Sequence, residues 1–118
     1  MNKFNVLQWK IYWANLDTIR ESEQSGKRPV IIISPDEINE FLPIVAVVPL
    51  TSLKTGRRIY PTEVLLLKSL TGLEKDSIAM SHQIRVLSRV RLIRECGAIE
   101  SEDIKNKIRS VVKLFLDL

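Results

Sequence analysis

Residues 26–34 read Gly-Lys-Arg-Pro-Val-Ile-Ile-Ile-Ser, and the interpretation of the whole chain starts from this stretch. Its unbroken β-branched run predicts a buried strand over residues 29–34, because Val and Ile are stiff at χ1 and pack well on a pleated surface. Arg28 then lies at the mouth of a strand, where its planar fork of donors matches a phosphate. Taken alone, the same residues also fit an ordinary surface cation beside an edge strand.

The length of 118 residues predicts one domain over residues 1–118 with a single core. No apolar run reaches the roughly 18–20 residues of a membrane span, and we expect no membrane partner and no secretory signal. The single cysteine, Cys96, excludes an internal disulfide framework and favours a reducing compartment, so we expect a cytoplasmic protein. No Cys/His set has the spacing of a zinc site.

The formal net charge of +4 favours polyanionic partners, such as a nucleic acid or an acidic protein. Residues 1–9 are expected to form a loosely held arm, and residues 9–15, dense in strand formers, a first strand. The polar residues 18–27 that follow have no apolar period. A loop this long in a small domain indicates a working role, with a plain connector as the alternative.

After the strand at 29–34, Ser34 is expected to cap a short helix that ends near residue 41, with Pro35 at its first position. Further strands are predicted over residues 43–49 and 60–66. Residues 50–52 are expected to leave the first of these strands, residues 54–58 to form a basic turn, and residues 69–73 a connector.

Residues 77–86 alternate in polarity and predict one long bent strand or two short ones. Residues 90–93 add a short strand, with Gly97 as a break. Ser101 then caps an amphipathic C-terminal helix whose apolar stripe comprises Ile104, Ile108, Val111, Val112 and Phe115. Many short strands with a late helix predict an α+β fold built on a small, mainly antiparallel sheet or barrel.

Several segments now form an ordered series, which consists of residues 11–17, 21–34, 47–52, 60–64, 72–77 and 83–85 with 91–92. Together they resemble the MazF/PemK/Kid family of toxin endoribonucleases, from about residue 10 to residue 115. The resemblance implies an SH3-like barrel with short helices, a homodimer, and an acidic antitoxin that wraps the RNA-binding surface. It also implies sequence-specific cleavage of single-stranded RNA with no metal and no cofactor, which leaves 2′,3′-cyclic phosphate and 5′-hydroxyl ends and inhibits translation.

Two residues match the family pattern best, Arg28 before the proline at the second strand and Thr51 after the third. The resemblance assigns catalysis to them. A fixed guanidinium can stabilise charge on the phosphate oxygens, and a hydroxyl can bond the 2′-OH or a phosphate oxygen. Ser52 adds a second hydroxyl, and the alternative for both hydroxyls is a turn that bonds its own backbone.

The loop over residues 18–27 lies over the active site in the family, so Glu23 and Gln24 are candidate readers of unpaired bases. The remaining candidates for RNA contact are Lys27, Arg57, Arg58, Gln83 and Arg85. The aromatic residues Tyr12, Trp13 and Tyr60 fit either base stacking or core and dimer contacts.

The chain departs from the family pattern at two places. Trp9 and Lys10 stand where members often have Gly-Asp, and His82 stands where many have an acid that serves as a base. His82 is either a replacement base, since imidazole titrates near neutrality, or a half-buried structural histidine. Two other functions stay open from sequence: a CcdB-like, non-enzymatic toxin that inhibits DNA gyrase, and an RNA-binding barrel without catalysis.

Overall fold

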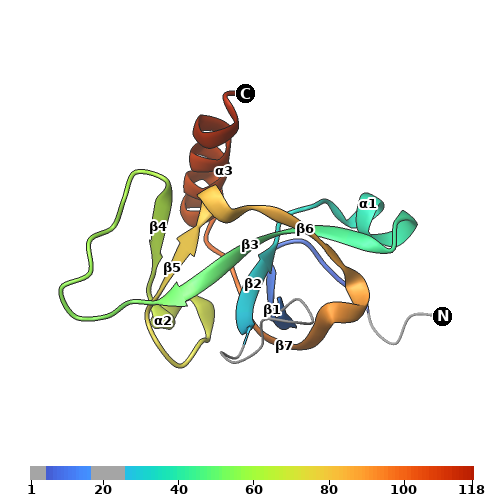
Figure 1. The fold of residues 1–118 in the computed structure, drawn as a ribbon, viewed down its shortest axis with the longest axis horizontal. Helices are drawn as coiled ribbons and strands as arrows, with labels where there is room; N and C mark the ends of the chain where they lie inside the picture. Colours follow the sequence, from blue (N-terminus) through green and yellow to red (C-terminus); the bar gives the residue numbers. More distant parts are fainter. Residues whose placement is uncertain (1–4, 17–25) are drawn as a thin grey trace.

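The computed structural model describes residues 5–16 and 26–118, and over these the chain forms a bent, mainly antiparallel sheet with helices at its margins (Figure 1). The strands are β1 Lys10–Asn15, β2 Lys27–Ile32, β3 Ile44–Ser52, β4 Glu63–Leu66, β5 Ser77–Met80, β6 Arg85–Ser88 and β7 Leu92–Ala98. The helices are α1 Asp36–Phe41, α2 Lys68–Thr71 and α3 Glu102–Leu116, with 3-10 turns at Ser81–Gln83 and Arg89–Arg91. The strand order β4-β5-β3-β2-β1-β7, with β6 also on β3, confirms the predicted α+β class and its barrel-like sheet.

The long strand β3 joins the two halves of the sheet. It pairs with β6 over Ile44–Val47, with β2 over Val47–Pro49, and with β5 over Leu50–Ser52. Pro49 has no N–H to donate, and it lies where the strand changes partner, so it costs the ladder little. The prediction that residues 50–52 leave the strand is therefore wrong, because β5 continues the ladder.

Alternate residues of β1 and β2 pack into two separate cores. Ile11 pairs with Ile31 and faces the cluster beneath α3, whereas Tyr12 pairs with Val30 and faces the cluster on the other side of the sheet. A strand covered on both faces has no polar side, which accounts for the β-branched run at the start of the chain. The run is buried as predicted, but β2 begins at Lys27, so Arg28 lies inside the strand and not at its mouth.

The C-terminal helix α3 lies across one face of the sheet as predicted (Figure 1). Ser101 Oγ accepts the Ile104 N–H at 3.3 Å as the expected cap, and Ile108 is buried in the core. Trp9 is buried below the helix with a φ of 74°, and the cationic groups of Lys105 and Arg109 stand 5.9 and 5.1 Å from its ring centroid. Left-handed backbone favours glycine, so the packing of Trp9 offsets a backbone cost of about 1–2 kcal/mol.

The segment before β1 is firmly anchored. Val6 is buried in the second core, and the Gln8 side chain donates to the Ile33 carbonyl at 2.8 Å. The prediction of a loosely held arm is wrong for residues 5–9, and residues 1–4 lie outside the described part of the chain. The prediction failed because contacts distant in sequence order this segment, and sequence periodicity does not reveal such contacts.

Ser34 does not cap α1, whose N-cap residue is Pro35. Its hydroxyl donates to Asn39 Oδ1 at 2.5 Å and accepts the Ala46 N–H at 3.0 Å. The buried Asn39 amide in turn donates to the Ser34 carbonyl at 2.9 Å. The cap prediction was therefore wrong because Ser34 connects α1 to β3 through a buried amide.

The prediction of a connector over residues 69–73 is wrong in part, since α2 forms there and ends at Gly72, whose φ of 83° suits a glycine C-cap. Gly97 lies inside β7, so the predicted break at this residue is wrong. A Cβ at this position would lie 2.6 Å from the Thr71 carbonyl oxygen, which explains why the residue is a glycine. The missing side chain lets the end of α2 lie close to β7. This contact positions residues 72–75, which follow α2 and line the pocket described below.

The remaining segments refine the predicted boundaries. Residues 77–86 form the two short strands β5 and β6, separated by a 3-10 turn, as one of the two predicted options. The fourth strand starts at Glu63 and not at residue 60, because residues 60–62 lead into a turn whose Tyr60 carbonyl accepts the Glu63 N–H at 2.9 Å.

Candidate functional site

A pocket of about 410 Å³ opens where the last residues of β3 meet β1, β2 and β7. Its polar lining includes the hydroxyls of Thr51, Ser52 and Ser77. Its other principal walls are Trp13, Pro29, Glu74, Lys75, Arg94 and Cys96. The pocket thus combines hydroxyl donors, cations and an aromatic ring, which is the chemistry that a nucleotide requires.

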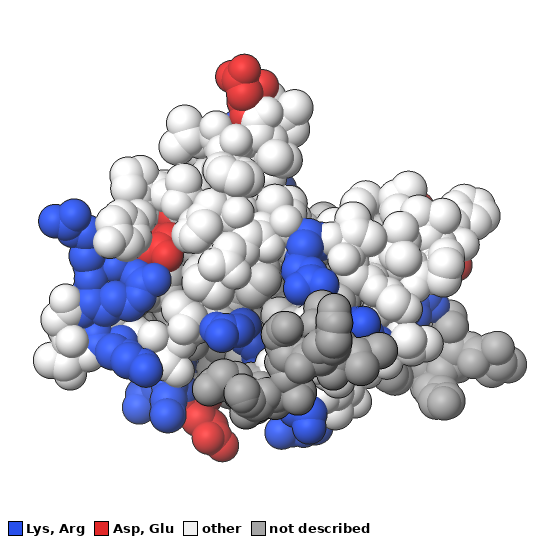
Figure 2. Space-filling view, viewed as in Figure 1, with Lys and Arg blue, Asp and Glu red and all other residues white. Residues whose placement is uncertain are grey.

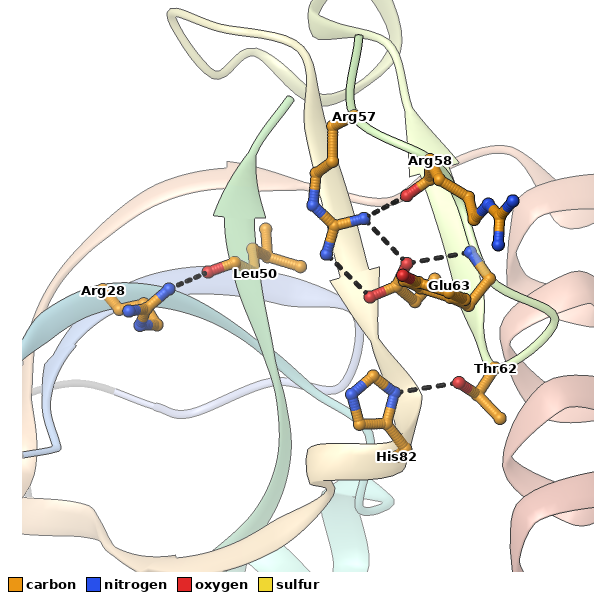
Figure 3. Close-up of polar contacts among 8 residues, drawn as sticks. Arg28, Leu50, Arg57, Arg58, Thr62, Glu63 and His82 are labelled. Carbon is orange, nitrogen blue, oxygen red and sulfur yellow. Dashed lines mark hydrogen bonds and ion pairs between the residues drawn. The ribbon is translucent and has the colours of Figure 1, made fainter. Parts of the chain in front are cut away.

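Arg28 and Thr51 project from neighbouring strands toward the same face of the sheet. Val30 pairs with Pro49, so Arg28, two residues before Val30, and Thr51, two residues after Pro49, share the face of that pair. The Arg28 guanidinium donates to the Leu50 carbonyl at 3.3 Å (Figure 3). The structure therefore places the two predicted catalytic residues on one face of neighbouring strands, and of the two Thr51 lines the pocket, which Arg28's neighbour Pro29 also lines.

The charge of Arg28 has no acidic partner within the described residues, because none of their ion pairs includes it. Its one hydrogen bond to a described residue, the Leu50 carbonyl, is long, and within that part of the chain most of the guanidinium donors are unused. A half-buried arginine in this state can bind a bidentate anion such as a phosphate.

Thr51 and Ser52 are paired in β3 with Ile78 and Ser77, so neither belongs to the turn that was the alternative from sequence. Because successive residues of a strand point to opposite faces, Thr51 shares the face of Arg28 while Ser52 shares the face of Leu50. Both still line the pocket, since it lies at the end of the strand.

His82 lies on the α3 side of the molecule, away from the pocket lining. Its Nδ1 is 2.9 Å from the Thr62 hydroxyl, and its ring meets Phe115 edge to face at 6.5 Å between centroids. Figure 3 shows His82 and Arg28 on opposite sides of the β3 ribbon. The structure therefore does not bring His82 together with Arg28 and Thr51.

Arg57 binds a carboxylate of its own chain. Its two terminal nitrogens donate to the buried Glu63 carboxylate at 2.9 Å each, and the Tyr60 N–H donates to the same group at 3.0 Å (Figure 3). The hydrogen bonds from Arg57 hold the pKa of Glu63 below its ordinary value, although burial acts in the opposite direction. The same contact raises the pKa of Arg57.

The loop between β3 and β4 is the most basic part of the face drawn in Figure 2, where blue side chains gather at the left. Its cations are Lys54, Arg57 and Arg58, and the Arg58 guanidinium stands 5.7 Å from the Tyr60 ring centroid. Arg57 is occupied by Glu63, so Lys54 and Arg58, both exposed, supply most of the positive charge that this loop offers to a ligand.

The other predicted contacts are dispersed. Lys27 is exposed and lines a second hollow of about 260 Å³ with Trp13, Ile93 and Arg94. Gln83 is exposed in the first 3-10 turn, and Arg85 is exposed on β6, opposite Val47. The predicted base readers Glu23 and Gln24 lie outside the described residues.

Lys75, Arg94 and Cys96 line the pocket although the sequence pattern did not mark them as site residues. These residues reach it through the approach of α2 to β7 and the register between β1 and β7. Burial raises the pKa of the Cys96 thiol, so the thiol is a neutral part of the wall. The sequence of β7 does not alternate regularly between polar and apolar residues, so its pattern did not indicate which way Arg94 points.

Over residues 5–16 and 26–118, no group of three or more His, Cys, Asp or Glu side chains is arranged to hold a metal ion. In the same part of the chain, none of the helices is both long and apolar enough to cross a membrane.

Known proteins resemble this chain in sequence and in fold. Endoribonuclease MazF9 of Mycobacterium tuberculosis is 33% identical over 114 residues, which cover 92% of this chain and 94% of that protein. Endoribonuclease MazF of Staphylococcus saprophyticus is 34% identical over 108 residues, which cover 92% and 88%.

Among solved structures, MazF of Deinococcus radiodurans superposes with a TM-score of 0.78 at 23% identity, covering 98% of this chain and 99% of that one. A MazE-MazF structure from the same organism gives 0.77 at 25% identity, with 98% of each chain covered. The family model described as "PemK-like, MazF-like toxin of type II toxin-antitoxin system" matches residues 7–116. On this match and the two curated relatives, the chain belongs to the PemK-like, MazF-like family of type II toxin–antitoxin toxins.

Proposed function

We propose that this toxin is an endoribonuclease that acts in the cytoplasm and cuts single-stranded RNA within a short sequence, with no metal. The observation that carries the proposal is the placement of Arg28 and Thr51 on one face of neighbouring strands, where Thr51 also lines a pocket with hydroxyls and cations. Family membership and the two relatives named endoribonucleases support it.

The reaction that suits these groups is an internal transesterification. The ribose 2′-oxygen forms a bond to the adjacent phosphorus, and the bond from phosphorus to the 5′-oxygen breaks. The 2′-OH proton passes to a base, and the departing 5′-oxygen gains a proton. The products are a 2′,3′-cyclic phosphate and a 5′-hydroxyl, and cutting mRNA in this way inhibits translation.

Arg28 stabilises the charge that grows on the non-bridging phosphate oxygens in this step. A guanidinium held by β2 and the Leu50 carbonyl is already oriented, so little reorganisation is needed as the charge develops. Thr51 positions the 2′-OH or a phosphate oxygen with its hydroxyl. The place of His82 beside Thr62 and Phe115 argues against it as the acceptor of the 2′-OH proton.

The protein partners that we propose are an acidic antitoxin and a second copy of this chain. A net charge of +4 and the basic loop between β3 and β4 give an acidic segment something to bind. One of the similar solved structures is a MazE-MazF complex, which supports an antitoxin of the same kind here.

The test is the cleavage of a long, unstructured RNA by the purified toxin in EDTA, with the ends mapped and their chemistry determined. We expect cuts at one short sequence, cyclic phosphate ends, and loss of cutting in Arg28→Ala. A matched control is Arg109→Ala, which removes an arginine on α3 outside the pocket. Intact RNA, or equal cutting by Arg28→Ala, would overturn the proposal, and inhibition of gyrase supercoiling with intact RNA would replace it by the gyrase-directed alternative.

A further inference from the structure

Trp13 and Arg94 form a ridge between two hollows on the surface. The two residues face each other across the β1–β7 ladder, with the Arg94 guanidinium 5.9 Å from the indole centroid. Both residues line the pocket of about 410 Å³ that contains Thr51, and both line the hollow of about 260 Å³ that contains Lys27. A single strand of RNA that extends from one hollow to the other would therefore pass over this ridge.

The indole of Trp13 belongs to neither core. Trp9 is 7% exposed and packs in the cluster beneath α3, whereas Trp13 is half-buried and contributes to neither buried cluster. An aromatic ring on a pocket wall, outside the packed interior, offers a flat apolar surface to a ligand. This placement favours base stacking over the core role that aromatic residues of a first strand usually have.

The ridge is also electropositive. Arg94 is exposed, and none of the ion pairs of the described residues includes it. Lys75 stands in the larger pocket and Lys27 in the smaller hollow, while Glu74 is an acidic member of the larger lining. Cations on both sides of an aromatic ring are typical of surfaces that follow a single strand of nucleic acid.

We propose that Trp13 and Arg94 form a nucleotide subsite next to the cleaved bond: one base of the RNA stacks on the Trp13 indole, and Arg94 binds a neighbouring backbone phosphate. The subsite rests on the proposed endoribonuclease function and extends it, because it assigns part of the binding and sequence preference to β1 and β7. A stacked base is held by its face, so this subsite tolerates several bases and the bases in other positions determine the sequence that is cut.

The first experiment combines protein variants with abasic substrates. A short cleavable RNA is prepared in versions that lack one base at each position around the cut, and KM and kcat are measured for the parent, Trp13→Ala and Trp13→Phe. We expect Trp13→Ala to raise KM on the order of tenfold with a smaller change in kcat, and Trp13→Phe to recover most of the loss. At one position of the RNA, removal of the base should raise the KM of the parent as much as Trp13→Ala does. Removal of that same base should not raise the KM of Trp13→Ala any further.

The matched control is Trp9→Phe, since Trp9 is the other tryptophan of the chain and lies in the core. It is expected to lower the stability of the fold and to leave KM for the RNA unchanged. Additive effects of Trp13→Ala and base removal at every position, in a parent that cuts RNA, would overturn the subsite and leave the endoribonuclease function standing.

Fluorescence separates the subsite from catalysis. Binding of an RNA with a 2′-deoxy residue at the cut should quench the emission of the parent, and the quench should vanish in Trp13→Phe but persist in Trp9→Phe. A parent that cuts no RNA overturns the proposed function, and absence of the quench then overturns the subsite as well. A quench without cutting supports the subsite as a binding site alone.

The role of Arg94 has its own measure. If Arg94 binds a phosphate, Arg94→Gln lowers the slope of log KM against log salt concentration by about 0.7. Arg109→Gln, which removes an arginine from α3, should leave the slope unchanged. Equal slopes for the parent and Arg94→Gln would remove the phosphate contact from the proposal.

Discussion

Arg28 and Arg57 carry the same group, yet their surroundings give them opposite tasks. Arg57 places two donors on the buried Glu63 carboxylate at 2.9 Å, whereas the bond that Arg28 makes to a described residue is one of 3.3 Å to a backbone carbonyl. The first charge is neutralised inside the molecule, and the second is balanced by no carboxylate of the described residues. An arginine without a carboxylate partner is the one that can bind an incoming phosphate, and sequence composition does not distinguish the two.

The largest expected effect is the loss of cleavage in Arg28→Ala. Removal of one preorganised donor to a developing oxyanion costs about 10²–10³-fold in kcat. The thermal stability of the variant should stay near that of the parent, because Arg28 has no ion pair within the described chain to lose. Single-turnover cleavage and thermal unfolding, measured side by side, check both parts.

Arg28→Lys provides the matched control, since it keeps the charge and removes the fork of donors. We expect it to recover only a small part of the rate. A variant that cuts as fast as the parent would show that Arg28 acts as a point charge, and the contrast with Arg57 would then rest on position alone.

The next effect is the reverse combination, a loss of stability with cleavage retained. Glu63→Gln removes the charged partner of Arg57 and should lower the free energy of unfolding by about 1.5–3 kcal/mol, the range for hydrogen bonds to charged groups. Urea unfolding gives the stability, and the cleavage rate measured well below the midpoint gives the activity. A strong loss of cleavage in a folded Glu63→Gln protein would contradict the structural role of this pair.

A smaller effect follows from pH. The pKa of Glu63 lies below its ordinary value of 4.5 because Arg57 hydrogen-bonds the ionised form. The stabilisation from this pair is therefore complete above the unfolded-state pKa, and it is lost as the pH falls through the lower folded-state pKa. The difference in unfolding free energy between the parent and Glu63→Gln should shrink between pH 6 and strongly acidic pH in urea titrations. A difference that stays constant over this range would mean that the carboxylate is not held ionised by Arg57.

The smallest effect is expected at His82. His82→Gln removes the ring that meets Phe115 and the bond to Thr62, so it should cost about 0.5–1.5 kcal/mol of stability and leave kcat unchanged. The pH–rate profile is the decisive measurement, because a structural histidine does not move it. A loss of the acidic limb of that profile in His82→Gln would identify His82 as the base, and it would show that the residue reaches the RNA from the α3 side.

The sequence predicted those parts of the molecule that follow from local pattern. The buried run of β2 and the capped helix α3 were predictable because their apolar residues repeat with the period of a strand and of a helix. Arg28 and Thr51 were found through the family pattern, and the structure places them on one face of neighbouring strands.

The parts that could not be predicted depend on contacts distant in sequence. Ser34 carries a good capping side chain, but a buried Asn39 binds it instead. In the sequence, Gly97 suggests a break, yet it lies inside β7, and the neighbouring Thr71 carbonyl explains why this strand position is a glycine. The pairing of Arg57 with Glu63 crosses a loop of irregular backbone, and Arg94 reaches Trp13 through strand register, so neither leaves a periodic signal.

The strand β3 has a consequence for the order in which the molecule opens. Its residues pair in turn with β6, β2 and β5, while β4 and β7 lie at the two ends of the strand order. Backbone amides in such a strand exchange with solvent only through openings that approach global unfolding, whereas edge strands exchange through local ones. Thr51 is a residue of this slowly exchanging strand. Heating should therefore abolish cleavage in the same narrow temperature interval in which the sheet unfolds, without a partly ordered, inactive state at lower temperature.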